Sequence, residues 1–319
     1  MIFEKQVIAA YRGMAYTRCD DNGTAFYFSA EDFEGLHREP YLFTASAGHR
    51  LQGYLYHYDN PAPGRLIVFD HGFGGGHRSY LREIEMLASH GYLVLAYDHT
   101  GCMESGGKNP NGMAQSLCDL NDCINTVKAD PRFAGFDLSV MGHSWGGFST
   151  LNISALHPDI SRVVVLSGFV SVEELIKSYF SGLMKGYRKP IMELERRANP
   201  YFSTFDAVTS LSKTNAKVLL IYSDDDGMCK PIHYDILKKG LEGRTNIRLQ
   251  LVGGKGHNPN YTKDAVQYLG AYIREKNTLM KRKLLETDEQ KEAFRASFDW
   301  KRMTDQDTSV WKEIFACLE

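Results

Sequence analysis

The chain lacks the features that mark several large protein classes. Its 37 lysines and arginines nearly balance 39 aspartates and glutamates, so the basic surface that binds phosphate backbones is not expected. No apolar run reaches the roughly 18 residues of a membrane-spanning helix, and Glu4 and Lys5 interrupt the N-terminus where a signal peptide would be apolar. We therefore expect a cytoplasmic protein that binds no nucleic acid and does not cross a membrane.

Cysteine is also scarce, and no motif for a metal or cofactor is present. The six cysteines form no CxxC pair, which argues against a disulfide framework or a zinc site. The acids Asp224–Asp226 are consecutive rather than spaced as in a calcium loop, and HGFGGGH lacks the lysine that follows a phosphate-binding loop. The sequence thus predicts reduced cysteines and neither a metal nor a cofactor.

Short apolar runs rich in β-branched residues alternate with amphipathic segments from about residue 65 onward. This alternation is typical of a mostly parallel central sheet flanked by helices, an α/β fold. The predicted strands are 65–70, 92–98, 138–141, 162–168, 217–223 and 247–253. The predicted helices are 80–90, 114–129 and 146–157. Two further runs flank Ala47–His49 and predict an antiparallel hairpin at one edge.

Two segments fall outside this alternation. Residues 169–216 have no strand pattern and are predicted to form a helical lid, inserted between core segments 1–168 and 217–275. Residues 276–319 are predicted to form a C-terminal helical extension that packs on the core or on a second copy, as in a homo-oligomer. We expect about a third of the lid's aromatic and Met residues to face the site: Tyr179, Phe180, Met184, Tyr187, Met192, Tyr201, Phe202 and Phe205.

The motif GHSWGG places Ser144 between a predicted strand and a predicted helix. A strand that turns into a helix through a single residue strains that residue, and Gly142 and Gly146 leave room for the turn. The turn raises the Ser144 hydroxyl above the sheet, beside the free N–H groups of the helix N-terminus. Ser144 is therefore the candidate nucleophile.

An acid and a base follow Ser144 in the order that such a turn requires. DDDGMCKP follows the strand KVLLIYS and offers Asp224, Asp225 and Asp226, and GKGHNPN follows the strand IRLQLVG and contains His257. Ligand sites of open α/β sheets form outside the carboxyl ends of the strands, where both segments are expected. A serine hydroxyl needs such a base, and the base needs an orienting acid.

The glycine-rich segment HGFGGGH follows the strand RLIVFD. Its backbone can approach a substrate closely, so the N–H groups of Phe73 and Trp145 are candidate donors to an oxyanion. We expect His71 and His77 to shape this loop rather than to transfer protons.

These motifs resemble those of the α/β-hydrolase superfamily. The resemblance extends from about Leu42 to Lys276 and is carried by HGFGGG, DHTGCMESGG, GHSWGG, the acid after KVLLIYS, and GKGH. It implies a serine hydrolase in which Ser144 is the nucleophile, His257 the base and Asp226 the acid. Phe73 and Trp145 match the family's oxyanion donors.

Two positions depart from the family pattern. Cys102–Met103 stands where a second glycine is usual, and Ser223 stands where a glycine usually precedes the acid. The second departure leaves the acid open within Asp224–Asp226, with Asp226 preferred.

The expected activity is cleavage of an acyl bond in a small-molecule substrate. An ester is the preferred substrate class, and a short peptide is the second choice. A serine aminopeptidase is the alternative enzyme, because Trp145 after the nucleophile is similar to some of those peptidases. A non-catalytic ligand-binding protein of the same fold is the alternative outside enzymes. An aminopeptidase would need a lid carboxylate for the substrate amine, and the candidates are Glu173, Glu174, Glu193 and Glu195.

Overall fold

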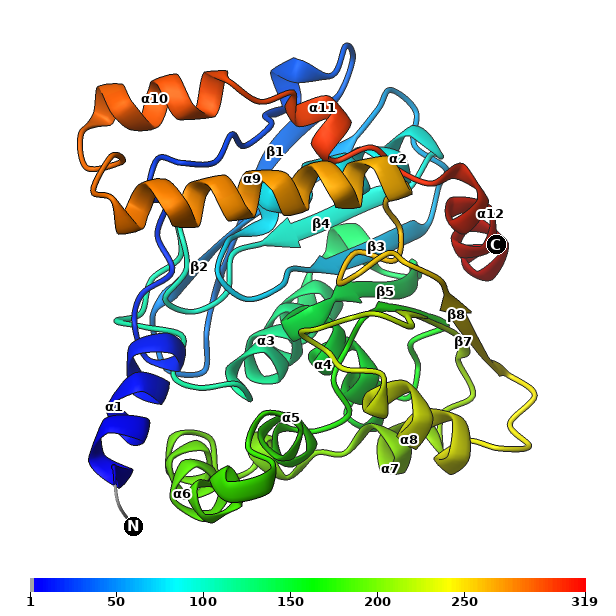
Figure 1. Ribbon diagram of the computed structural model, residues 1–319. Coiled ribbons are helices and arrows are strands. Elements are labelled where there is room, and N and C mark those ends of the chain that lie inside the picture. Colours follow the sequence, from blue (N-terminus) through cyan, green and yellow to red (C-terminus); the bar gives the residue numbers. More distant parts are fainter. Residues whose placement is uncertain (1–2) are drawn as a thin grey trace.

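The computed structural model describes residues 3–319 and contains one eight-stranded sheet of order β1-β2-β4-β3-β5-β6-β7-β8 (Figure 1). β1 and β2 form the predicted hairpin, β2 is antiparallel to β4, and the six remaining strands are parallel. The strands are β1 His37–Thr44, β2 Arg50–His57, β3 Arg65–Asp70, β4 Leu93–Tyr97, β5 Asp137–His143, β6 Arg162–Leu166, β7 Lys217–Ser223 and β8 Ile247–Val252. The predicted α/β architecture is confirmed.

The central strands are apolar on both faces because helices cover both. Alternate residues of β3 point to opposite sides: Val68 joins the core under α3 and α4, whereas Ile67 and Phe69 join the core under α2 and α12. The helices of these layers are α2 Leu81–Ser89, α3 Gln115–Ala129, α4 Ser144–Asn152, α8 Ile232–Gly240 and α12 Thr308–Leu318. This double coverage fixes the sheet's carboxyl edge, where the candidate residues lie.

The predicted lid contains two helices beside the site and one that belongs to the core. The first part of the segment predicted as a lid contains α5 Val172–Tyr179, a 3₁₀ segment Gly182–Tyr187 and α6 Arg188–Ala198. α7 Ala207–Leu211 instead packs against α4, in the helical layer beneath the sheet. The segment predicted as a lid, residues 169–216, therefore also contains a helix that packs on the core.

The predicted start of the C-terminal extension, residue 276, lies inside α9. This helix runs without interruption over Lys263–Lys281, so the extension begins after Lys281. It comprises α10 Asp288–Ala296, α11 Trp300–Met303 and α12. α12 packs on β6 and β7, so the extension docks on the core of the same chain.

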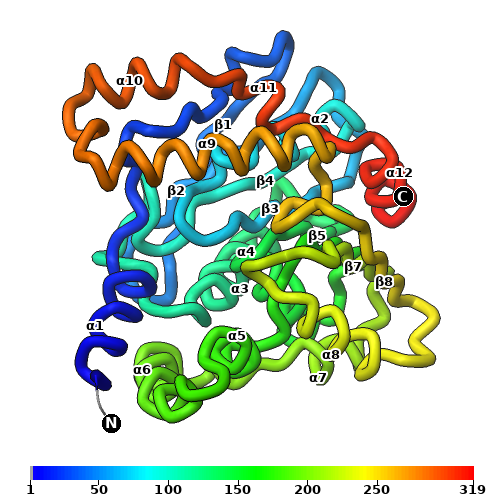
Figure 2. The backbone as a smooth tube through the Cα atoms, in the orientation of Figure 1, coloured from blue at the N-terminus to red at the C-terminus, as the bar shows by residue number. Residues whose placement is uncertain are grey.

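An N-terminal helix, α1 Glu4–Ala15, was not predicted. It lies beside α6, as the tube in Figure 2 shows, although residues 16–187 separate the two helices in sequence. Its signal was the helical spacing of Val7, Tyr11 and Met14. Within residues 3–319, no helix combines the length and the apolar character needed to cross a bilayer.

Trp311 tests whether α12 is part of the core. Its side chain is 1% exposed and its indole N–H donates to Gln306 Oε1 over 2.8 Å. Trp311→Ala should lower the free energy of unfolding by about 3–5 kcal/mol, measured by urea denaturation. The exposed neighbour Lys312→Ala is the control, and a loss no larger than that of the control would contradict the docking of α12.

Candidate active site

Ser144 occupies the strained turn between β5 and α4. Its φ is 57°, in the left-handed region that residues other than glycine rarely adopt. A Cβ on Gly146 would lie 2.1 Å from the Asp70 carbonyl oxygen, and one on Gly142 would lie 2.4 Å from the Gly146 carbonyl oxygen. The two glycines are therefore required for the turn, as the sequence predicted.

The three consecutive acids after β7 all hold the loop that carries His257. Asp226 accepts a hydrogen bond from His257 Nδ1 at 2.8 Å, Asp225 accepts one from the Gly256 amide at 2.7 Å, and Asp224 accepts one from the Gly254 amide at 2.9 Å. Asp226 is 2% exposed and also accepts the amides of Met228 and Cys229. Among the three, Asp226 is therefore the carboxylate that contacts the imidazole.

The second nitrogen of His257 is available for proton transfer. Among residues 3–319, its buried Nε2 has no hydrogen-bond partner, so no hydrogen bond joins it to Ser144. The structure thus brings Asp226 and His257 into contact, without a hydrogen bond between His257 and Ser144. Catalytic hydrogen bonds commonly tighten only when substrate binds.

His143 lies beneath the turn and supports His257. Its Nε2 is 2.7 Å from the His257 carbonyl oxygen, and its Nδ1 is 2.8 Å from the Tyr80 hydroxyl. Burial lowers the pKa of His143 to about 3, so the ring is neutral and acts as a fixed spacer.

The side chains of the two residues that carry the candidate oxyanion donors are in contact. The rings of Phe73 and Trp145 meet edge to face with centroids 5.0 Å apart. Trp145 is the second residue of α4, so its N–H has no acceptor within the helix. His71 Nε2 accepts the His99 amide at 2.9 Å, and burial lowers the pKa of His71 to about 3, consistent with a loop-shaping role.

A buried ion-pair cluster supports this loop from below. His99 Nε2 lies 2.9 Å from Asp70, its Nδ1 lies 3.2 Å from Asp119, and its ring is 4.6 Å from that of Trp145. Burial alone would lower the pKa of His99, but the two carboxylates outweigh it and raise the pKa to about 10. His99 is therefore a buried cation between two carboxylates.

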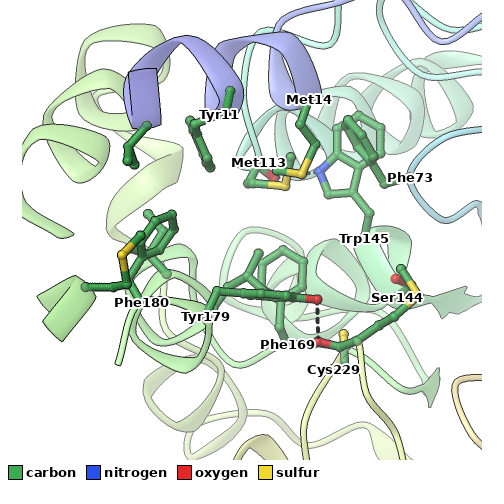
Figure 3. Close-up of a pocket in the computed structure, with 16 residues that line it drawn as sticks. Tyr11, Met14, Phe73, Met113, Ser144, Trp145, Phe169, Tyr179, Phe180 and Cys229 are labelled. Atoms are coloured by element: carbon green, nitrogen blue, oxygen red, sulfur yellow. Dashed lines mark hydrogen bonds between the residues drawn. The ribbon is translucent and has the colours of Figure 1, made fainter. Parts of the chain in front are cut away.

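A pocket of about 460 Å³ opens beside Ser144 (Figure 3). Figure 3 shows Tyr11 and Met14 of α1 along one side, Tyr179 and Phe180 of the lid along another, and Ser144 at one end. Three of the eight lid residues considered above line it, namely Tyr179, Phe180 and Met184. The sequence reasoning missed the contributions of α1 and Met113, which come from segments with no catalytic motif, and that of Cys229, whose segment was considered only for its acids.

The four lid carboxylates considered for amine binding are all engaged elsewhere. Glu195 is fully buried and accepts the Tyr11 hydroxyl at 2.7 Å, and burial raises its pKa. Glu173 and Glu174 each lie 2.8 Å from Lys177, and Glu193 pairs with Arg197. None of the four lines the pocket beside Ser144.

Residues 61–251 match the family model described as "Serine aminopeptidase, S33". The chain belongs to this family. Among curated proteins, this S33 member is 26% identical to the putative carbamate hydrolase RutD of Agrobacterium fabrum, over 45% of this chain and 53% of that protein. It is 30% identical to cutinase 1 of Thermobifida cellulosilytica, over 32% of this chain and 38% of that protein. The chain thus spans about half or less of the length of these curated relatives.

Solved structures agree with this S33 assignment at the level of fold. The esterase Pf2001 of Pyrococcus furiosus superposes with a TM-score of 0.59 at 17% identity, covering 81% of this chain and 96% of that one. The acetyl xylan esterase of Paenibacillus sp. R4 superposes with a TM-score of 0.57 at 19% identity, covering 73% and 82%. The chain is an α/β hydrolase.

The His99 cluster predicts how stability depends on pH. His99 is protonated in the folded state up to about pH 10, whereas an unfolded histidine loses its proton near pH 6.5. The free energy of unfolding should therefore fall as pH rises above about 6.5, by up to about 1.4 kcal/mol per pH unit. Urea denaturation between about pH 7 and 8 measures this slope, and the same series with a His99→Gln variant separates it from the opposite contribution of the buried neutral histidines, such as His71 and His143, and from thiol titration. Equal slopes in the two proteins would contradict a buried His99 cation.

Proposed function

We propose that this chain is a serine hydrolase that cleaves carboxylic esters, with Ser144 as nucleophile, His257 as general base and Asp226 as orienting acid. One observation carries the proposal. Asp226 holds one nitrogen of His257 at 2.8 Å, the other nitrogen is buried without a partner among the described residues, and the His257 ring lies 4.6 Å from that of His143, the residue before Ser144. A buried, unpartnered nitrogen costs stability, which is tolerated where it serves a reaction.

In the proposed reaction, Ser144 Oγ attacks the ester carbonyl carbon while His257 Nε2 accepts its proton. Asp226 fixes the tautomer and stabilises the imidazolium. The N–H groups of Phe73 and Trp145 bind the oxyanion, each contributing about 3 kcal/mol in the transition state. His257 then protonates the departing alkoxide, and a water that His257 deprotonates cleaves the acyl-enzyme.

The pocket favours an ester over an aminoacyl amide. A substrate ammonium group beside Ser144 would need a carboxylate, because an unpaired buried charge is strongly destabilising. The candidate lid carboxylates pair with Tyr11, Lys177 and Arg197 instead. We therefore expect p-nitrophenyl esters to be hydrolysed in preference to aminoacyl p-nitroanilides, and the reverse preference would favour the aminopeptidase alternative.

Ser144→Ala removes the proposed nucleophile without adding bulk at the turn. Ester turnover should fall by about 10⁴-fold or more, with the fold intact by circular dichroism. The matched control is Ser212→Ala, an exposed serine after α7, which should retain full turnover. Turnover that persists in the purified Ser144→Ala protein would exclude this mechanism, and no turnover in the unmodified protein would favour the ligand-binding alternative.

A further inference from the structure

The pocket beside Ser144 offers few polar groups to a ligand, because polar side-chain atoms in its wall form hydrogen bonds within the protein. Trp145 Nε1 donates to the Met113 carbonyl oxygen at 2.6 Å, and the Tyr179 hydroxyl donates to the Met228 carbonyl oxygen at 2.9 Å. The Tyr11 hydroxyl donates to Glu195. Apart from Ser144, Cys229 and the proposed oxyanion donors, a ligand in this pocket therefore meets apolar surface.

Methionine and phenylalanine side chains form much of the rest of the pocket wall. Its four methionines come from four separate segments and can adapt to a chain of variable shape. They are Met14, Met113, Met184 and Met228. Three phenylalanines add rigid surface, namely Phe73, Phe169 and Phe180.

Helix α1 closes one side of this pocket and is held firmly in place. Val7, Ala10, Tyr11 and Met14 line the cavity from successive turns of α1. The buried Glu195 of α6 accepts hydrogen bonds from Tyr11 and Tyr16 and from the Met113 amide, which ties α1 to the lid and to the pocket floor. The α1 wall is therefore a fixed boundary.

The position of His257 identifies which half of an ester enters the pocket. The general acid must contact the leaving oxygen, so the alcohol half lies on the side of His257. His257 does not line this pocket, whereas Ser144, Phe73 and Trp145 do. The acyl half therefore points away from His257, toward α1 and the lid.

We propose that this pocket binds unbranched aliphatic acyl chains of medium length, hexanoyl to decanoyl, with α1 as the wall that limits their length. The inference rests on the proposed function. The volume of about 460 Å³ lies in the range that buries most of a small ligand. Each buried methylene gains up to about fourfold in kcat/KM until the chain reaches α1.

The experiment compares p-nitrophenyl esters from acetate to dodecanoate. kcat/KM should rise from acetate to a maximum between hexanoate and decanoate and then fall. Ala10→Trp, which fills the pocket from α1, should lower the octanoate-to-acetate ratio of kcat/KM about tenfold or more. The adjacent Ala9→Trp is the matched control, since Ala9 is exposed on the same helix but does not line the pocket, and it should leave the ratio unchanged.

The outcomes separate this inference from the proposed function. Absence of turnover with every ester overturns the proposed function. Turnover with a flat chain-length profile, or equal ratios in the two tryptophan variants, overturns only the acyl-chain inference.

An independent set of contacts links the C-terminal extension to the His257 loop. The buried Lys255, two residues before His257, lies 2.5 Å from Asp307 and also donates to the Tyr261 carbonyl oxygen. The Asp307 amide donates to the Asn260 carbonyl oxygen at 2.8 Å, and Asn260 Nδ2 donates to Gln306 at 2.8 Å.

We infer that Asp307 is a positioning residue for His257, acting through Lys255. Asp307→Asn should lower kcat about tenfold with KM unchanged, and Asp307→Glu should restore much of it. Glu313→Gln is the matched control, because it breaks an ion pair between α12 and Arg248 of β8, away from the His257 loop. Equal kcat values in Asp307→Asn and Glu313→Gln, or a loss that follows thermal stability alone, would overturn the inference.

Discussion

The site depends on one constraint, the left-handed backbone of Ser144. A residue with a side chain adopts this conformation only when its surroundings impose it. Here β5 ends and α4 begins at the same residue, and Gly142 and Gly146 let the turn approach the carbonyl oxygen of Asp70. The parallel sheet holds β3 and β5 in register at this point, pairing Asp70 with Gly142. Core packing therefore supports the strain that directs the Ser144 side chain to the sheet edge.

Carboxylates hold the other loops around the site in place. Asp224, Asp225 and Asp226 each bind a different part of the His257 loop, and Asp307 binds the same loop through Lys255. Next to His71 in the loop after β3, Asp70 and Asp119 hold the His99 cation. The groups proposed to react thus lie on loops whose backbone is fixed by charged hydrogen bonds rather than by apolar packing alone.

Local signals explain what could be predicted from the sequence. The strands are continuous apolar runs, and the Ser144 turn is encoded within six residues by GHSWGG. His257 and the acid cluster could be assigned because each directly follows a strand. Met103, at a place where the family pattern usually has a glycine, takes a φ of 41°, a left-handed conformation that glycine adopts readily.

The pocket could not be predicted, because it is assembled by tertiary contacts. The periodicity of α1 does not reveal that Glu195 holds this helix beside the lid. Glu195 looked like a surface carboxylate in a charged segment and is instead fully buried. The extension beyond Lys281 carried only a helical pattern, and its link to the His257 loop depends on the folded position of Asp307.

The central claim is that Ser144 is the residue that becomes acylated. Incubation with a fluorophosphonate, followed by digestion and mass spectrometry, tests it directly. We expect one phosphonyl adduct on the peptide that contains Ser144, formed much more slowly in a His257→Gln variant. An adduct on another residue, or ester turnover in a protein that remains unlabelled, would contradict it.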